Sequence, residues 1–234
     1  MPKIRLYLEK EIIKDQKILL SSDQKHYLKN VMRKKNSEKI LIFNKESEWE
    51  CFLNIDNDVS VTPIRFVRSN KEIPDIWICF SIIKPRNINF LVEKVTEIGV
   101  KRIVPIETEF SEKINLNISR LKKIIIEAVE QSNAMNLPEI DNTVKIEKLL
   151  AEWEDDRIII LCDELGGNSI LDETVRLKNS KKTGIFIGPV GGWSFNDKRL
   201  FENKQVHRVS LGENILKADT AAIYSLSCLK ALIK

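Results

Sequence analysis

The sequence predicts an α/β domain with a parallel sheet, preceded by a small module of short β-strands. From about residue 74 onward, apolar strand-like runs alternate with amphipathic helical segments, which is the pattern of a parallel α/β sheet. Before about residue 70, short strand-like runs are separated by polar turns. The segment between the two regions, RSNKEIPD at 68–75, is polar, charged and contains Pro74, as linkers do.

Residues 1–70 hold five strand-like runs, and their close spacing favours a small barrel. In chain order these runs are KIRLYL, KILLS, EKILIFN, EWECFLNID and VSVTPIRFV. One helical segment, QKHYLKNVMRKK, interrupts them, and Ser22–Asp23 precede it as a candidate N-terminal cap.

Residues 74–234 begin with a continuous apolar strand, IWICFSII, and an amphipathic helix that Gly99 ends. The remaining predicted strands are KRIVPIET, RIIILCDE, KTGIFIG and QVHRVSLG. The predicted helices between and after them are ISRLKKIIIEAVEQSNAM, VKIEKLLAEWEDD, SFNDKRLFENK and DTAAIYSLSCLKALIK.

Composition excludes several classes of protein. The chain has 234 residues, 43% of them hydrophobic, and no run of about 18 apolar residues that would predict a membrane span. Its charged start lacks the apolar core of a signal peptide, so we expect a cytoplasmic protein. The four cysteines (Cys51, Cys79, Cys162 and Cys228) are scattered, which indicates reduced, mostly buried thiols and no zinc site. With only two histidines, we expect no metal.

The net charge of +4 lies entirely in the first module, where residues 1–70 hold 14 Lys and Arg against 10 Asp and Glu. A basic module beside a neutral one points to a polyanionic partner. A solvated lysine-rich face would give the same counts.

The stretch GIFIGPVGGWS, residues 184–194, ends a predicted strand in a glycine-rich bend. Ligands of open α/β sheets bind at the carboxyl ends of strands. The spacing is neither GxGxxG nor GxxxxGK[ST], but its glycines expose bare backbone that a flat ligand can approach. Ser194 or Asn196 would cap the next helix. A strand-to-helix turn that binds nothing remains the alternative.

SLGENILKADTAAI, residues 210–223, repeats this arrangement, with a helix expected to open at Asp219–Thr220. We expect the two bends to face each other across one pocket. Ile215 and Leu216, apolar in a polar loop, either fill the core or line a slot for an aromatic ring.

These two stretches closely resemble the paired C-terminal motifs of the ribosomal RNA small subunit methyltransferase E family, I-G-P-E-G-G-[FLW]-S and L-G-x-R-I-L-R-x-E-T-A. Further passages resemble the family in the same order: HYLKNVMRKKNSEKILIFN, FLVEKVTEIGVKRIVPIETEFS and RLKKIIIEAVEQSNAMNLPEI. The resemblance therefore spans nearly the whole chain. It implies a SPOUT-class enzyme that methylates N3 of a uridine in 16S rRNA with S-adenosylmethionine.

The resemblance also implies the domain organisation. Residues 1–70 would be a PUA-like β-barrel that binds RNA, and residues 74–234 a SPOUT methyltransferase domain with a C-terminal trefoil knot. Chains usually avoid knots, so the strand pattern alone would not predict one. The family works as a homodimer on the small ribosomal subunit. The cofactor contacts implied by the resemblance are Leu161, Gly188, Pro189, Gly191, Gly192, Leu211, Gly212, Ile215 and Leu216.

This chain departs from the family motifs at polar positions. Val190 stands where the family has Glu, Asn214 and Lys217 where it has Arg, and Asp219 where it has Glu. The lysine keeps the charge of an arginine but loses its planar fork. Two alternatives to a uridine methyltransferase follow: an RNA-binding or ribosome-assembly protein that keeps the pocket but has lost activity, and a SPOUT enzyme with another RNA target.

Uracil N3 is a weak acid, and its anion is the better nucleophile for an in-line methyl transfer. The sequence offers no convincing general base: His207 lies on an apolar strand and fits a structural role, and His26 fits a surface or RNA contact. Cationic stabilisation of the anion is therefore expected, with Lys217 and Arg120 as catalytic candidates. The candidate RNA contacts are Arg5, Lys29, Arg33, Lys34, Lys35, Lys84 and Arg86.

Overall fold

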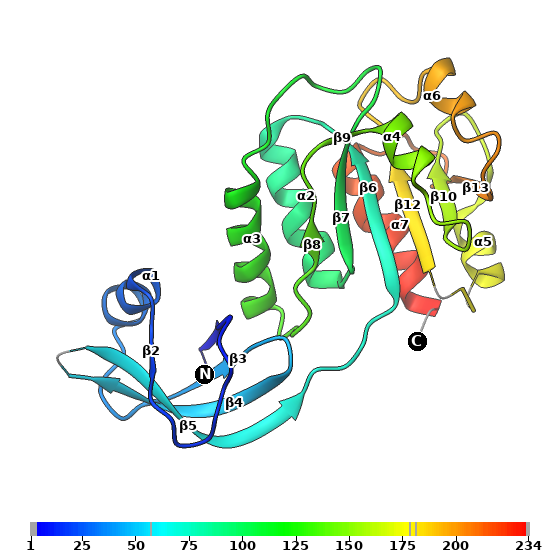
Figure 1. Cartoon of the computed structure of the whole chain (residues 1–234). Coiled ribbons are helices and arrows are strands. Elements are labelled where there is room, and N and C mark those ends of the chain that lie inside the picture. The colour runs from blue at the N-terminus through cyan, green and yellow to red at the C-terminus, as the bar shows by residue number, and fades with distance from the viewer. Residues whose placement is uncertain (1–3, 57, 178, 181, 233–234) are drawn as a thin grey trace. The chain divides into compact units, whose positions relative to one another are not determined.

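The computed structural model describes residues 4–56, 58–177, 179–180 and 182–232. The chain divides into two compact units (Figure 1). Unit 1 comprises Met1–Glu72 and Val129–Asn136, and unit 2 comprises Ile73–Ala128 and Leu137–Lys234. Within the described ranges, no helix is both long and apolar enough to cross a membrane.

Unit 1 is built on a five-stranded sheet in the order β1-β3-β4-β5-β2. Its strands are β1 (Arg5–Tyr7), β2 (Ile18–Leu19), β3 (Lys39–Phe43), β4 (Ser47–Ile55) and β5 (Val59–Ser69). β1 pairs in parallel with β3, and the other pairings are antiparallel. Register shifts in the β4–β5 pair, at Glu48/Trp49 and Glu50/Cys51, mark bulges of the kind that bend long strands.

The core of unit 1 is a cluster of aliphatic side chains from the inward face of this sheet. Leu28, Ile40, Ile42, Leu53 and Val61 are fully buried in it. Leu28 comes from the helical segment, which is α1 (Ser22–His26) followed by the π-helical turn η1 (Tyr27–Val31). The cap lies one residue before the predicted Ser22–Asp23, because the Ser21 hydroxyl accepts a hydrogen bond from the Gln24 amide in a capping box.

Arg5 is part of the interior of unit 1. Its Nε donates to Glu48 at 2.6 Å, and its other nitrogens donate to the carbonyls of Val129, Glu130 and Ala134 at 2.8–3.2 Å. Its guanidinium also stacks on Phe43, 4.3 Å from the ring centroid. The expected RNA contact by Arg5 is wrong for this structure, because its side chain is 6% exposed and four of its five N–H groups already donate within unit 1.

Unit 2 contains a parallel sheet in the order β11-β13-β10-β12-β6-β7-β8, with β9 also paired to β7. Its strands are β6 (Asp75–Ser81), β7 (Arg102–Glu107), β8 (Glu139–Ile140), β9 (Val144–Lys145), β10 (Ile158–Cys162), β11 (Asn168–Ser169), β12 (Lys182–Ile187) and β13 (Val206–Ser210). Its helices are α2 (Pro85–Ile98), α3 (Ile118–Gln131, which enters unit 1 at Val129), α4 (Ile146–Ala151), α5 (Ile170–Arg176), α6 (Phe195–Arg199) and α7 (Ala218–Leu232). The predicted α/β domain with a parallel sheet is confirmed.

Helices cover both faces of this sheet. α2 and α7 pack against each other, and α7 also contacts β12 and β6, as Figure 1 shows. On the other face α4 supplies Ile146 and Leu150 to a core that contains Leu161, Phe186 and Trp153. This face also fixes a glycine, because a Cβ on Gly184 would overlap the indole of Trp153.

Two helices of unit 2 end or begin at the capping residues that the sequence predicts. Gly99, with φ of +99°, caps α2, and Ser194 caps α6 through a hydrogen bond from the Asp197 amide at 3.0 Å. α7 begins at Ala218, one residue before the predicted Asp219. The bends that follow β12 and β13 therefore lie between an ordered strand and an ordered helix.

Candidate functional site

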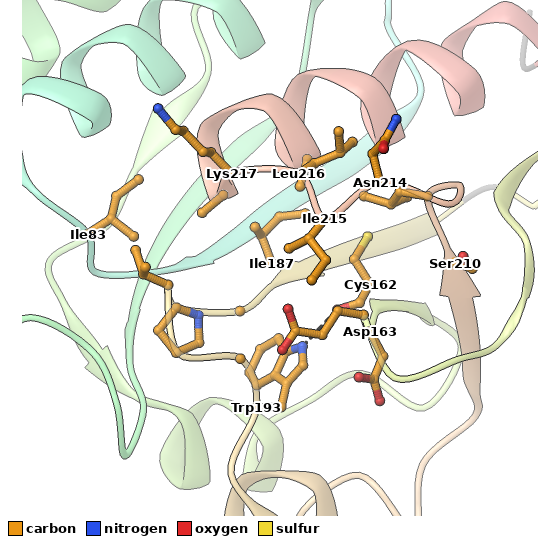
Figure 2. A pocket seen from close by; sticks show the side chains of 18 of the residues that line it. Ile83, Cys162, Asp163, Ile187, Trp193, Ser210, Asn214, Ile215, Leu216 and Lys217 are labelled. Atoms are coloured by element: carbon orange, nitrogen blue, oxygen red, sulfur yellow. Dashed lines mark hydrogen bonds between the residues drawn. The ribbon is translucent and has the colours of Figure 1, made fainter.

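A cavity of about 500 Å³ lies in unit 2, at the carboxyl ends of β10, β12 and β13 (Figure 2). Its walls come from the bend after β12, the bend after β13, the end of β10 and the start of α2. The bend after β12 contributes residues 187–190 and 192–193, and the bend after β13 contributes residues 210–218, together with Ala221 of α7. The end of β10 contributes residues 162–164, and the start of α2 contributes residues 83–84 and Asn87. The two glycine-rich bends therefore face one pocket, as predicted.

The first bend is held open by a tryptophan. The Trp193 indole Nε1 donates to the Cys162 carbonyl at 2.8 Å, which ties this bend to the end of β10. A Cβ on Gly188 would lie 3.1 Å from the indole ring, so a side chain there would crowd it. Gly192 has φ of +74°, a left-handed conformation that favours glycine. The buried Trp193 therefore fixes the position of this bend at the wall of the pocket.

The second bend exposes apolar side chains and backbone. Gly212 has φ of +119°, and its amide and carbonyl both bond the Ser210 hydroxyl at 3.3 Å. Ile215 is 81% exposed, so it does not fill the core. Figure 2 shows Ile215 over Ile187 inside the pocket, with Leu216 beside it. The apolar residues of this loop consequently line a slot.

Two acids follow β10 directly at the wall of the pocket. Asp163 is buried and pairs with Lys198 at 2.8 Å, so its charge is balanced. Glu164 is exposed to the pocket. Cys162 precedes them, and burial raises the pKa of its thiol to about 12, so it remains protonated at neutral pH and is no nucleophile.

Two lysines stand at the start of the helices that border the pocket. Lys84 precedes α2 and Lys217 precedes α7, and both are exposed. Asn87 of α2 donates to Asp219 of α7 at 3.1 Å, which holds the two helix starts together. The pocket therefore has two lysines at the end that borders the starts of α2 and α7.

The structure brings most of the predicted cofactor residues together. Those that line the pocket are Gly188, Pro189, Gly192, Leu211, Gly212, Ile215 and Leu216. Leu161 points into the core cluster beside α4, and its successor Cys162 lines the pocket instead. Gly191 is not among the lining residues, and a Cβ there would make only an ordinary contact with Phe110.

The remaining predicted site residues separate into two groups. Lys217 and Lys84 line the pocket, whereas Arg120 is exposed on α3 and does not line it. Arg86 is exposed at the start of α2. On unit 1 the helical segment and the turn after it carry Lys29, Arg33 and Lys35, all exposed, and Lys34, which pairs with Glu38 at 2.6 Å.

The histidines take no part in the pocket. The His207 ring Nδ1 lies 2.8 Å from the Glu173 carboxylate, which agrees with the structural role expected for it. Sequence reasoning missed Ile83, Asn87, Asp163 and Glu164 as lining residues. The acid pair at the end of the predicted strand RIIILCDE was the available signal, because polar side chains at that position meet the ligand edge of a parallel sheet.

Comparisons with known proteins place the chain in a family. A family model described as an RNA methyltransferase domain matches residues 70–230, and one described as an RNA methyltransferase PUA domain matches residues 20–62. A ribosomal RNA small subunit methyltransferase E of Rickettsia conorii is 30% identical over 97% of this chain and 95% of its own length. The chain belongs to the ribosomal RNA small subunit methyltransferase E family. A second member, from Borreliella burgdorferi, is 32% identical over 95% of this chain and 92% of its own.

Solved structures agree with this membership. A methyltransferase of Legionella pneumophila, solved with its bound cofactor SAM, has a TM-score of 0.88 and 26% identity and covers 99% of this chain and 98% of its own. A ribosomal RNA small subunit methyltransferase E of Neisseria gonorrhoeae, solved with S-adenosyl methionine, has the same TM-score and coverage at 22% identity, which shows a common fold. The expected α/β domain with a parallel sheet, preceded by a PUA-like β domain, is confirmed, whereas the SPOUT class and the trefoil knot stay predictions.

Proposed function

We propose that this chain transfers a methyl group from S-adenosylmethionine to N3 of a uridine in 16S rRNA. The observation that carries the proposal is the pocket between the bends 188–192 and 211–217, where glycines leave main-chain atoms open to a ligand. Membership of a family named for rRNA methylation supports the substrate class.

The pocket suits this donor by several criteria. Its volume of about 500 Å³ lies in the range of small-molecule sites. Ile187, Leu211 and Leu216 offer apolar surface for an adenine ring, and the bends offer backbone amides and carbonyls for its polar edge. Gly192 has a φ of +74°, which favours glycine, and a Cβ there would lie 2.6 Å from the Glu164 carboxylate and displace that side chain.

When bound, the donor supplies an electrophilic methyl group on its sulfonium. The protein's task is to hold the uridine in line and to favour its N3 anion. Lys217 stands at the pocket edge before α7, where its ammonium and the helix N-terminus both stabilise negative charge. We propose Lys217 as the anion-stabilising residue and assign Arg120 no role, since it does not line the pocket of its own chain.

RNA would be positioned by exposed cations on both units. On the residue 1–70 domain these are Lys29 and Arg33, together with the half-buried Lys34, and on the residue 74–234 domain Lys84 and Arg86. Such phosphate contacts fix position and are weakened by salt. We also propose that the chain acts as a homodimer on the small ribosomal subunit.

Two measurements test this function. Calorimetry with S-adenosylmethionine measures donor binding, and mass spectrometry of 16S rRNA from a strain lacking the gene measures the modification. We expect binding, together with one uridine methyl group that is missing and is restored by the wild-type gene. Binding without any missing methyl group would contradict the proposal and favour an RNA-binding protein that keeps the pocket. A missing methyl group on another RNA would favour a different target.

Lys217→Ala tests the catalytic assignment. The variant should bind S-adenosylmethionine within about threefold of wild type but transfer methyl groups at least about tenfold more slowly, as removal of a charge-stabilising donor does. Lys148→Ala is the matched control, since Lys148 is exposed on α4 and does not line the pocket. Undiminished turnover by Lys217→Ala would remove Lys217 from the mechanism.

A further inference from the structure

Glu164 places a free carboxylate in the wall of the pocket. It lines the cavity and, among the described residues, makes no hydrogen bond or ion pair through its side chain. The neighbouring Asp163 differs, because Lys198 neutralises it and the Leu165 amide donates to it at 3.1 Å. Of the two acids that follow β10, only Glu164 is left available to a ligand.

The carboxylate of Glu164 lies over the glycine bend. Its Oε1 is 2.6 Å from the position that a Cβ would take on Gly192, so any side chain there would displace it. Gly192 is also held in its turn by the hydrogen bond from its amide to the Pro189 carbonyl at 2.9 Å. Because Gly192 has no side chain, the bend leaves room for the Glu164 carboxylate.

We infer that Glu164 is a specificity-determining residue that recognises the ribose diol of the methyl donor. The inference rests on the proposed function, since it names which part of S-adenosylmethionine this side chain contacts. A carboxylate accepts hydrogen bonds from both hydroxyls of a vicinal diol, and acids near the ends of parallel strands bind ribose in this way in dinucleotide sites.

The lysines at one end of the pocket indicate where the methionine tail of the donor binds. Figure 2 shows Lys217 beside Ile83, across the pocket from Asp163. Lys84 also lies at this end, next to Ile83 in the chain. Lys84 attracts the carboxylate of the methionine tail, whereas Lys217 is assigned to the uridine anion.

The adenine ring belongs to the apolar slot formed by Ile187, Leu211 and Leu216. The ribose connects adenine to the methionine tail, so it must cross the middle of the pocket. Glu164 is then the group that meets its hydroxyls.

The test compares three ligands that share the ribose diol. S-adenosylmethionine carries a sulfonium and a charged tail, S-adenosylhomocysteine carries the tail alone, and 5′-methylthioadenosine carries neither. Calorimetry measures the dissociation constant of each for the wild-type chain and for Glu164→Ala. We expect the substitution to weaken all three ligands by the same factor, about ten- to a hundredfold, as loss of hydrogen bonds to a charged group does. Glu164→Gln, whose amide oxygen still accepts, should lose less.

Two matched variants make the result specific. Glu202→Ala removes an exposed carboxylate of unit 2 that does not line the pocket, and it should leave all three dissociation constants unchanged. Glu213→Ala removes another pocket carboxylate, and a loss equal to that of Glu164→Ala would mean that only the overall charge matters, which overturns the inference. Thermal unfolding of each variant confirms that it is folded.

The remaining outcomes are also decisive. If Glu164→Ala weakens S-adenosylmethionine and S-adenosylhomocysteine but not 5′-methylthioadenosine, the carboxylate contacts the tail and the diol assignment is wrong. If no ligand is weakened, Glu164 has no role in recognition, while the proposed function stands because the wild-type chain still binds. If the wild-type chain binds none of the three, the proposed function fails and this inference fails with it.

Discussion

Arg5→Ala should destabilise unit 1 strongly, because Arg5 joins the sheet to the segment 129–136. The guanidinium pairs with Glu48 at 2.6 Å and donates to three backbone carbonyls of that segment. Truncation removes all of these contacts and leaves Glu48, 2% exposed, with less compensation for its buried charge.

The size of the effect follows from these contacts. Breaking a buried ion pair by removing one partner costs about 3 to 5 kcal/mol. Glu48 keeps Arg68, whose Nε donates to it at 2.6 Å, which places this loss near the lower limit. The three carbonyls that lose a charged donor add about 1 kcal/mol. We therefore expect a loss of about 4 kcal/mol, equivalent to a thousandfold change in the unfolding equilibrium.

Hydrogen exchange followed by mass spectrometry reads this loss locally, on peptides from β3, β4 and β5. Protection there should fall by up to about a thousandfold in Arg5→Ala, while β10 and β12 serve as an internal reference in unit 2. Arg65→Ala is the matched control, since Arg65 is 64% exposed, lies 3.5 Å from Glu50, and should cost less than about 1 kcal/mol. Equal protection in Arg5→Ala and Arg65→Ala would refute the structural role of Arg5.

Two further predictions concern titratable groups, the buried Cys162 and the half-buried Asp75. Because burial raises the pKa of the Cys162 thiol to about 12, iodoacetamide at pH 8 should leave Cys162 unmodified in the folded chain, and rapid labelling in a peptide map would contradict its position. For Asp75, burial acts to raise the pKa of the carboxyl, but the hydrogen bond and charge of Arg157, aided by Lys101 and Trp77, lower it below its ordinary value of 3.8. The folded pKa is then below the unfolded one, so this contribution to stability is complete above about pH 4 and is lost as the pH falls through the folded pKa. Urea unfolding at pH 6 and pH 3 should show a smaller acid loss for Asp75→Asn than for wild type, and identical losses would show that the pair is not linked to folding.

Local patterns predicted much of the fold and of the pocket. Gly99 and Ser194 predicted helix ends because a cap depends on residues a few positions apart. The bends at 188–192 and 211–217 were predicted to share a pocket because the parallel strands of one sheet present their carboxyl ends at the same edge. The alternation of strands and helices was enough for the parallel sheet of unit 2.

Features that depend on distant contacts were not predicted. Arg5 looked like a surface cation between two apolar neighbours, and only the segment 129–136, more than 120 residues away, buries it. Leu161 was predicted to contact the cofactor, but it points into the core, and the next residue, Cys162, lines the pocket. Successive side chains of a strand point to opposite faces, so an error of one residue exchanges the two faces. The free carboxylate of Glu164 is likewise a property of tertiary structure, because it depends on Lys198 pairing with Asp163 instead.

We propose that main-chain atoms of two glycine-rich bends hold the methyl donor. A crystal structure of the chain soaked with S-adenosylmethionine tests it most directly. We expect electron density for an adenosine moiety between residues 188–192 and 211–217, with backbone groups of both bends within hydrogen-bond distance. Density for the donor elsewhere on the chain, or no density in this pocket at saturating donor, would contradict it.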